Sequence, residues 1–402
     1  MTERAGETRA SGRTLAGATI LQIVPALREE PSARAALGTA VMLLQAGARA
    51  LVAGADGPLV NELQTHGGEW IPLTSETANP LRARRNVRRL QNLIASERVD
   101  IVHAHCAGGA DCARKAAMKA ATWLVTTLPD VPPKSRREFS RMSALTRGDC
   151  ITAPSAYAAA PAIEHYGLSR DQITIIPRSI DTAAFNRAAV AAERVESLRQ
   201  AWRIPATDRV VLIPGRVAPW NGQVLLPEVA ARLAENGHRG VIFALVGENR
   251  SHRRYARAVL DRANAEGVAG SFRITGHCRD MPAALAFADF VAIAALEPPV
   301  LGRDAAQAQA MGCPVVTTGI GILPEQVVVP PDLPEELRTG WVVPANDPQE
   351  LADALASALL LDRPAYEAMS DRARQFAEYM FSPETIAAQT REVYTSLLAR
   401  EP

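Results

Sequence analysis

The segment ALEPPVLGRDAAQAQAMGCPVVTTG, from Ala295 to Gly319, contains the pattern that is most informative about the fold. An apolar strand is expected to end near Ala295, a short loop follows it, and a helix is predicted to open around Gly302 before the next strand, PVVTT. A parallel sheet binds ligands beyond the carboxyl ends of its strands, and a helix that starts there offers unpaired N–H groups to an anion. The stretch therefore predicts an α/β fold with a site suited to a diphosphate at this loop.

The same alternation of apolar runs and helix-length segments continues in both directions along the chain. It covers the first half as far as about residue 177 and restarts near residue 209. Strands that are apolar on both faces and separated by helices indicate parallel, doubly wound sheets. We therefore expect a disordered tail over residues 1–17, sheet domains over 18–184 and 185–382, and a final helix over 383–402 that packs back on the first domain.

Composition fits this two-domain plan. The chain has 402 residues, of which 48% are hydrophobic and 22% charged, which suffices for two cores of ordinary size. No apolar run reaches the roughly 20 residues that cross a bilayer, and the polar N-terminus is unlike a signal peptide. The five cysteines are scattered without a C-x-x-C pair, and the segment HAHCAGGADC fits no common zinc spacing. We expect a cytoplasmic protein with reduced thiols, no metal and no cofactor.

Six motifs, in order along the chain, carry a family resemblance. They are IIPRSIDTAAF, PGRVAPWNGQ, GHCRDMPAALAFADF, EPPVLGR, AQAMGCPVV and TGWVVPANDPQELADAL. Together they resemble family 4 of the glycosyltransferases, and most of all the bacterial members thought to build lipopolysaccharide core and other surface glycans. The resemblance implies the GT-B fold, in which two Rossmann-like domains face a cleft. It also implies retaining transfer without a metal, with the nucleotide sugar on the C-terminal domain and the acceptor on the N-terminal one.

The resemblance assigns donor contacts to the second domain. Arg216 matches the arginine that the family places on the donor diphosphate, and a planar cation suits that role. Asn221 stands where the family usually has lysine, and an amide cannot neutralise a phosphate. The family's two glutamates fall at Pro299, which has no acceptor, and at Gln307, which keeps one for a ribose hydroxyl. The predicted donor contacts are Arg216, Asn221, Gly302, Arg303 and Gln307.

One acid remains in the loop before this helix. Glu297 could replace the missing sugar contact, and the alternative is a structural role in a loop stiffened by Pro298 and Pro299. No other side chain is a candidate for catalysis.

The first domain also departs from the family pattern. Pro129 and Asp130 stand where the family commonly has histidine and glycine near the transferred sugar, and Glu29 and Glu30 replace a glycine-rich loop. Acids that face a diphosphate would repel it, whereas acids that face solvent cost little. His105 is expected to line the acceptor site.

A basic segment precedes the fourth apolar run. Its arginines cover about half of a helix circumference, and they are Arg82, Arg84, Arg85, Arg88 and Arg89. A solvated face is one interpretation, and contact with an anionic membrane at the inner face, where a lipid-linked acceptor would lie, is the other. Nucleic acid is not expected as a partner, because no aromatic platform accompanies the arginines.

Three hypotheses follow for function. The first is a glycosyltransferase that moves a sugar from a nucleotide sugar to a cell-surface glycan or lipid-linked acceptor. The second is a catalytically inactive relative that acts as a scaffold or as the partner of an active transferase, because Pro299, Gln307, Asn221 and Pro129 all depart from the family pattern. The third is an epimerase or phosphorylase of the same architecture. The sequence leaves open whether the chain is an enzyme.

Overall fold

The chain divides into two compact units. The first unit joins Met1–Arg178 to Ile386–Pro402, and the second is Ser179–Thr385. The computed structural model describes residues 14–77, 79–120, 122–299, 302–331 and 333–400. Most of the predicted tail, residues 1–13, thus lies outside the described residues, while Leu15 is buried in the first unit.

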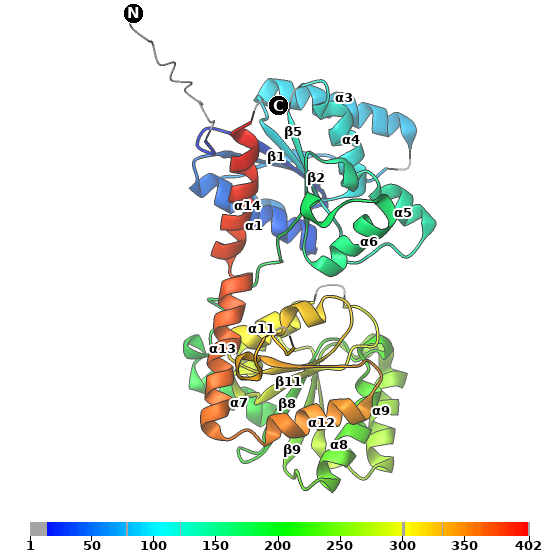
Figure 1. Ribbon diagram of the computed structural model, residues 1–402, viewed down its shortest axis with the longest axis vertical. Coiled ribbons are helices and arrows are strands. Elements are labelled where there is room, and N and C mark those ends of the chain that lie inside the picture. The colour runs from blue at the N-terminus through cyan, green and yellow to red at the C-terminus, as the bar shows by residue number, and fades with distance from the viewer. Residues whose placement is uncertain (1–13, 78, 121, 300–301, 332, 401–402) are drawn as a thin grey trace, which may run out of the picture. The chain divides into compact units, whose positions relative to one another are not determined.

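The first unit is built on a seven-stranded sheet in the order β3-β2-β1-β4-β5-β6-β7 (Figure 1). Every strand pairing in it is parallel. The strands are β1 (Thr19–Ala26), β2 (Arg49–Ala55), β3 (Glu69–Pro72), β4 (Ile101–Ala104), β5 (Trp123–Thr127), β6 (Cys150–Ala153) and β7 (Ile173–Ile175). The strand order reverses between β1 and β4, so a switch point for ligand binding lies at their carboxyl ends.

Helices cover both faces of this sheet. They are α1 (Pro31–Gln45), α2 (Leu59–Thr65), α3 (Pro80–Glu97), α4 (Ala107–Ala117), α5 (Arg136–Met142), α6 (Ala156–Tyr166) and the C-terminal α14 (Pro383–Leu398). Buried side chains of α3, α4 and α6 form one core with the sheet, and those of α1, α2 and α14 form another. Alternate residues of β1 enter the two cores, because successive side chains of a strand point to opposite faces.

The second unit repeats the plan with six parallel strands in the order β10-β9-β8-β11-β12-β13. The strands are β8 (Arg209–Pro214), β9 (Val241–Val246), β10 (Phe272–Gly276), β11 (Phe290–Ile293), β12 (Val315–Thr318) and β13 (Gly340–Val343). The helices are α7 (Ala192–Ala201), α8 (Leu226–Glu235), α9 (Arg253–Ala265), α10 (Met281–Phe287), α11 (Asp304–Ala310), α12 (Pro348–Leu359) and α13 (Arg363–Phe381). Its switch point lies between β8 and β11.

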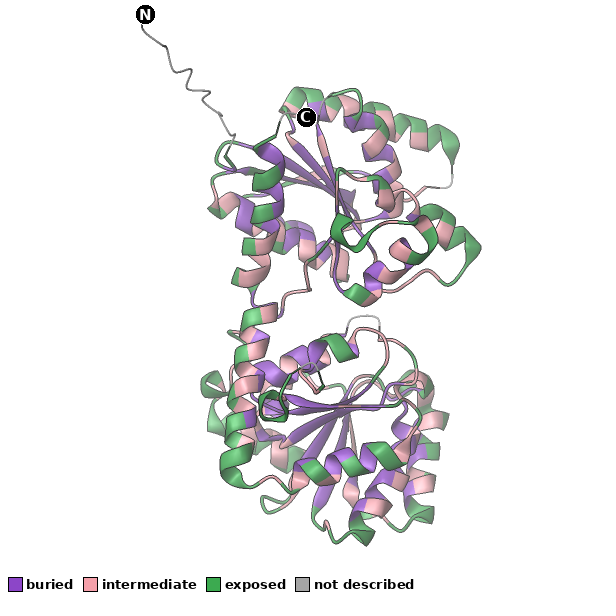
Figure 2. Ribbon diagram, viewed as in Figure 1, coloured by how far each residue is buried: buried purple, intermediate pink, exposed green. Residues whose placement is uncertain are grey.

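Burial follows these layers. The strands of both sheets are largely buried, and the helices are buried along one face and exposed along the other (Figure 2). The pair of parallel, doubly wound sheets predicted from the sequence is confirmed. Within the described ranges, no helix combines the length and the apolar character that crossing a bilayer requires.

Candidate functional site

A narrow pocket opens at the switch point of the second sheet. It lies beyond the ends of β8 and β11. Two glycines with positive φ, Gly215 and Gly302, line it together with Asn221, Asp304 and Pro299. Its volume of about 40 Å³ admits little more than water. The structure therefore brings together three residues singled out from the sequence, Asn221, Pro299 and Gly302, at the place where a doubly wound sheet binds ligands.

The turn after β8 is held by one carbonyl. Asn221 Nδ2 and Gln223 Nε2 both donate to the backbone oxygen of Arg216, at 2.7 and 2.8 Å. Gly215 has φ of 104°, and a Cβ built there would lie 3.4 Å from Asn221 Nδ2. The Asn221 amide, predicted to contact the donor, is thus engaged in closing this turn.

Arg216 follows directly and is exposed. Its side chain is not among the groups that line the pocket, although its neighbour Gly215 is. The role of Arg216 at a diphosphate stays a prediction.

The loop after β11 is tied to the same turn. The backbone N–H groups of Leu296 and Glu297 both donate to the Trp220 carbonyl, at 2.8 and 3.1 Å. The backbone hydrogen bonds fix where Glu297 lies, and its residue is exposed. Its role as a substitute sugar contact stays a prediction.

Helix α11 begins later than the sequence indicates. It starts at Asp304, and Arg303 is its N-cap rather than a residue of its first turn, so the predicted opening at Gly302 was wrong by two residues. Gly302 causes the difference, because its φ of 53° belongs to the left-handed region, so this residue cannot be part of the right-handed helix. Gln307 lies one turn further along α11 and is partly exposed.

Gly302 cannot carry a side chain without a rearrangement. A Cβ at this position would lie 2.5 Å from Ile322 Cγ2. We expect Gly302→Ala to lower the free energy of unfolding by about 1–3 kcal/mol, from the left-handed conformation and the clash together. Gly267→Ala is the matched control, because Gly267 also has positive φ, 71°, but no atom within 4 Å of its Cβ position. If urea unfolding gives the same decrease in unfolding free energy for both variants, the close contact with Ile322 does not contribute to the loss of stability.

An acid that sequence reasoning missed stands at this pocket. The Asp304 carboxyl lies 4.0 Å from the Cβ position of Gly215 and lines the same pocket as Asn221. Burial raises the pKa of Asp304, and the neighbouring Arg303 guanidinium opposes the increase. A carboxylate here places negative charge at the point where an anionic ligand would approach the backbone.

The switch point of the first sheet holds a pair of stacked histidines. The ring centroids of His103 and His105 lie 4.0 Å apart. Gln22 Nε2 donates to the Ala36 carbonyl at 2.8 Å, so its Oε1 faces His105 Nε2, 3.1 Å away, and accepts a hydrogen bond from the N–H of that nitrogen. His105 Nδ1 is therefore the unprotonated nitrogen, and it is buried without a partner among the described residues. Burial, together with His103 and Arg178, lowers the pKa of His105 well below its usual value.

His103 belongs to a directed chain of hydrogen bonds. Thr152 Oγ1 donates to the Thr126 carbonyl at 3.3 Å, so it accepts from Thr127 Oγ1 at 2.8 Å. Thr127 in turn accepts from His103 Nε2 at 2.7 Å, which leaves His103 Nδ1 to accept the Tyr394 hydroxyl proton at 2.6 Å. Burial, reinforced by the charge of Arg178, lowers the pKa of His103 to about 3, so the ring is neutral. The threonines thus set the tautomer of His103 on β4, and the Tyr394 hydroxyl, on α14, donates to its remaining ring nitrogen.

Loss of the Tyr394 hydroxyl should be felt in stability. We expect Tyr394→Phe to lower the free energy of unfolding by about 1–3 kcal/mol, because it leaves the buried Nδ1 of His103 without a hydrogen-bond partner. Tyr379→Phe on α13 removes the same hydroxyl from a side chain that is 75% exposed, and it should change stability by less than about 0.5 kcal/mol. Thermal unfolding of the two variants measures the difference, and indistinguishable midpoints would remove the role assigned to Tyr394.

The acids of the first unit have defined partners. Asp130 forms a two-pronged ion pair with Arg178, at 2.7 and 2.9 Å, and both side chains are mostly buried. Glu29 pairs with Arg34 at the surface. The charge of Asp130 is therefore balanced within the first unit. Among the described residues, no three His, Cys, Asp or Glu side chains converge as a metal site would require.

Two family models match the chain. The model "Glycosyltransferase Family 4" matches residues 34–184, and "Glycosyl transferases group 1" matches residues 208–360. Together they cover most of both units.

Similar proteins point the same way. D-inositol 3-phosphate glycosyltransferase of Corynebacterium aurimucosum is 27% identical over 280 residues, which are 68% of this chain. The match spans 63% of that relative's length. The glycosyltransferase from Rickettsia africae has a similar structure, with a TM-score of 0.81, 24% identity, and coverage of 95% of this chain and 99% of its own. HepE from Anabaena, solved in complex with UDP, has a TM-score of 0.76 and 21% identity, with coverage of 94% and 100%.

Proposed function

We propose that this chain transfers a sugar from a nucleotide-sugar donor to a glycan acceptor. The chain belongs to family 4 of the glycosyltransferases and has the GT-B fold. The observation that carries the proposal is the pocket at the β8/β11 switch point, where Gly215, Asn221 and Gly302 meet. Glycines at such a point let a ligand's phosphates approach the backbone closely.

The donor that we propose is a UDP-sugar, held by the second unit. HepE, whose fold is similar, has been solved with UDP and with UDP-glucose. Negative charge grows on the departing diphosphate during transfer. Cations and hydrogen-bond donors of the protein that stabilise this charge therefore contribute most to the rate. Arg216 and Arg303 are the cations nearest to the pocket along the chain, and we assign them this role, with Gln307 at the ribose.

The acceptor is proposed to bind the first unit near His105. Its Nδ1 lone pair has no partner among the described residues, because the ring is neutral and Nε2 donates to Gln22. A neutral imidazole nitrogen accepts a hydrogen bond from a sugar hydroxyl. A surface glycan or lipid-linked acceptor, as in lipopolysaccharide and polysaccharide biosynthesis, fits the sequence resemblance, and we propose retaining transfer without a metal. The arginines of α3, all exposed, are proposed to contact an anionic membrane at the inner face.

One set of observations favours a second candidate, an inactive scaffold or partner of an active transferase. Pro299 offers no acceptor for a sugar, Asn221 is engaged with the Arg216 carbonyl, and Asp304 brings an acid to the pocket. Each of these weakens donor binding or charge stabilisation. A chain with this pocket could keep its fold while losing transfer.

Calorimetric titration with UDP-, GDP- and ADP-sugars, followed by a transfer assay with any donor that binds, tests both candidates. Binding with transfer, and an unchanged anomeric configuration in the product, supports the retaining enzyme. Binding without transfer to any offered acceptor supports the inactive relative, and release of free nucleotide without transfer supports a phosphorylase. The absence of binding by every nucleotide sugar would overturn the transferase.

A further inference from the structure

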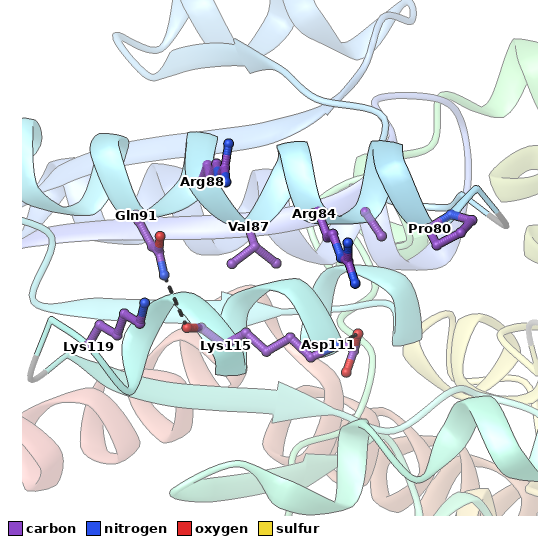
Figure 3. Close-up of a pocket in the computed structure, with 9 residues that line it drawn as sticks. Pro80, Arg84, Val87, Arg88, Gln91, Asp111, Lys115 and Lys119 are labelled. Atoms are coloured by element: carbon purple, nitrogen blue, oxygen red, sulfur yellow. Dashed lines mark hydrogen bonds and ion pairs between the residues drawn. The ribbon is translucent and has the colours of Figure 1, made fainter.

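A basic groove runs between α3 and α4 in the first unit. Its α3 wall is formed by Arg84, Val87 and Arg88, and its α4 wall by Lys115, with Lys119 just beyond the helix (Figure 3). Arg84 and Val87 are directed from α3 toward α4 in this view. The groove has a volume of about 460 Å³, which lies in the range of small-molecule sites. Its lining shares no residue with the pocket at the β8/β11 switch point.

The charges of this groove are not balanced by the protein. Asp111, the one acid in its lining, forms an ion pair with Lys115 at 2.7 Å. Within the ranges that the structure describes, Arg84, Arg88 and Lys119 form no ion pair. The lining therefore keeps three uncompensated cations around one hollow.

Helix stability does not explain this arrangement. Arg84 and Arg88 are four residues apart on α3, and like charges at this spacing destabilise a helix by about 0.2–0.5 kcal/mol per pair. On the other side, Lys119 follows the end of α4, four residues after Lys115. The arginines also gather in the first half of α3, and its last full turn ends at Glu97, which opposes the helix dipole at both ends. An anion bound in the groove relieves both repulsions.

We propose that this groove binds the phosphate group of a ligand, as an anionic lipid headgroup or a soluble phosphorylated compound presents it. Arginine offers a fork of N–H donors to phosphate oxygens and lysine a mobile point charge, so both walls can contact one phosphate or two neighbouring ones. Ala83 and Val87 supply an apolar surface beside the cations. The proposal deepens the membrane contact proposed for α3, because it selects two of the five arginines, and it does not depend on the donor pocket.

The lysines make the groove observable. Lys115, Lys119 and Lys134 are the only lysines in the 402 residues, and all three are exposed. Acylation with an amine-selective reagent, read by mass spectrometry, therefore reports on the groove at two sites and on the control position Lys134. Inorganic pyrophosphate that also binds the donor pocket does not disturb this readout, because that pocket holds no lysine. We expect saturating pyrophosphate at constant ionic strength to slow labelling of Lys119 at least about fivefold, with Lys134 changed less than about 1.5-fold.

Matched arginine variants separate a site from a diffuse charge. Arg84→Ser with Arg88→Ser removes two groove cations, and Arg85→Ser with Arg89→Ser removes two exposed cations of the same helix and spacing that lie outside the groove. We expect the first pair to abolish protection of Lys119 and the second to keep it within about twofold. Circular dichroism is the control that both variants keep the fold. Equal effects of the two pairs, or equal protection of Lys119 and Lys134, would overturn the proposal.

Vesicles distinguish the two sources of phosphate. Phosphatidylcholine vesicles that contain phosphatidic acid protect Lys119 and sediment the protein if the ligand is a headgroup, and pyrophosphate then competes. Protection by pyrophosphate alone assigns the groove to a soluble ligand. Vesicle binding that both arginine pairs weaken equally would leave the membrane contact in place and refute the groove.

Discussion

Replacing Asp304 with asparagine is expected to strengthen the binding of UDP-glucose at pH 7 by about tenfold or more, equivalent to about 1.4 kcal/mol. The carboxyl stands beside Gly215 at the mouth of the β8/β11 switch point, and two like charges about 4 Å apart repel by roughly 4 kcal/mol at an effective dielectric of 20. Asparagine keeps the size and removes the charge. Asp371→Asn, an exposed acid on α13 of the same unit, is the control and should leave the affinity unchanged.

The same substitution should remove a pH dependence. Because the folded pKa of Asp304 is raised, its carboxyl ionises at higher pH than in the unfolded chain, so it lowers stability as pH rises through that interval. Affinity for UDP-glucose should likewise fall as pH rises, and both trends should flatten in Asp304→Asn. Calorimetry and urea unfolding between about pH 4 and 8 measure them, a range that starts at the usual aspartate pKa of about 3.9 and extends upward because the folded pKa is raised. Parallel profiles for the wild type and Asp304→Asn would contradict the assignment.

The second prediction concerns variants that restore the residues with which the family contacts the donor, and it expects a large gain in sugar transfer. We expect the affinity for UDP-sugars to rise in the triple variant Pro299→Glu, Asn221→Lys and Gln307→Glu. The rate of sugar transfer should rise by about 100-fold, which corresponds to about 2.7 kcal/mol in the activation free energy. The new lysine adds the cation that a leaving diphosphate needs, at the cost of the 2.7 Å hydrogen bond to the Arg216 carbonyl, worth about 1 kcal/mol. Pro299→Glu adds a second acid close to Asp304 in the pocket lining, so the gain should be largest when Asp304→Asn accompanies the three changes.

A control set tests charge alone. Asn264→Lys and Gln200→Glu make similar changes at exposed positions of the same unit, and they should leave donor affinity within about twofold. Affinity that stays unchanged in the restored variant would show that the alignment of Pro299 and Gln307 with the family's acids is wrong.

Much of the architecture could be read from local patterns. Runs such as RVVLIPG and DFVAIAA are apolar on both faces and bounded by glycine or charged residues, and only a strand covered by helices on both sides explains that. The pocket could be located for the same reason, since Gly302 and Pro299 lie in a loop that the pattern placed after β11.

The rest depends on partners that are distant in sequence. In the sequence, Asp304 is an acid at a helix start, which the helix dipole favours. Only the neighbouring turn at Gly215 places it in a pocket. His103 and Tyr394 are 291 residues apart, and Asp130 and Arg178 are 48 apart. No spacing rule connects such pairs. The signal that could have found Asp304 is its place two residues after the glycine at which a ligand loop turns.

The return of α14 to the first unit has a consequence for synthesis on the ribosome. Val393, Tyr394, Leu397 and Leu398 complete a core whose other members precede residue 151, with Ile176 and Ala387 packed against it. A nascent chain that has already emerged through β7 still lacks these side chains. It exposes one apolar face of its first sheet, with His103 Nδ1 unpaired, while about 200 further residues are translated. The first part of the protein to be made is therefore among the last to be finished.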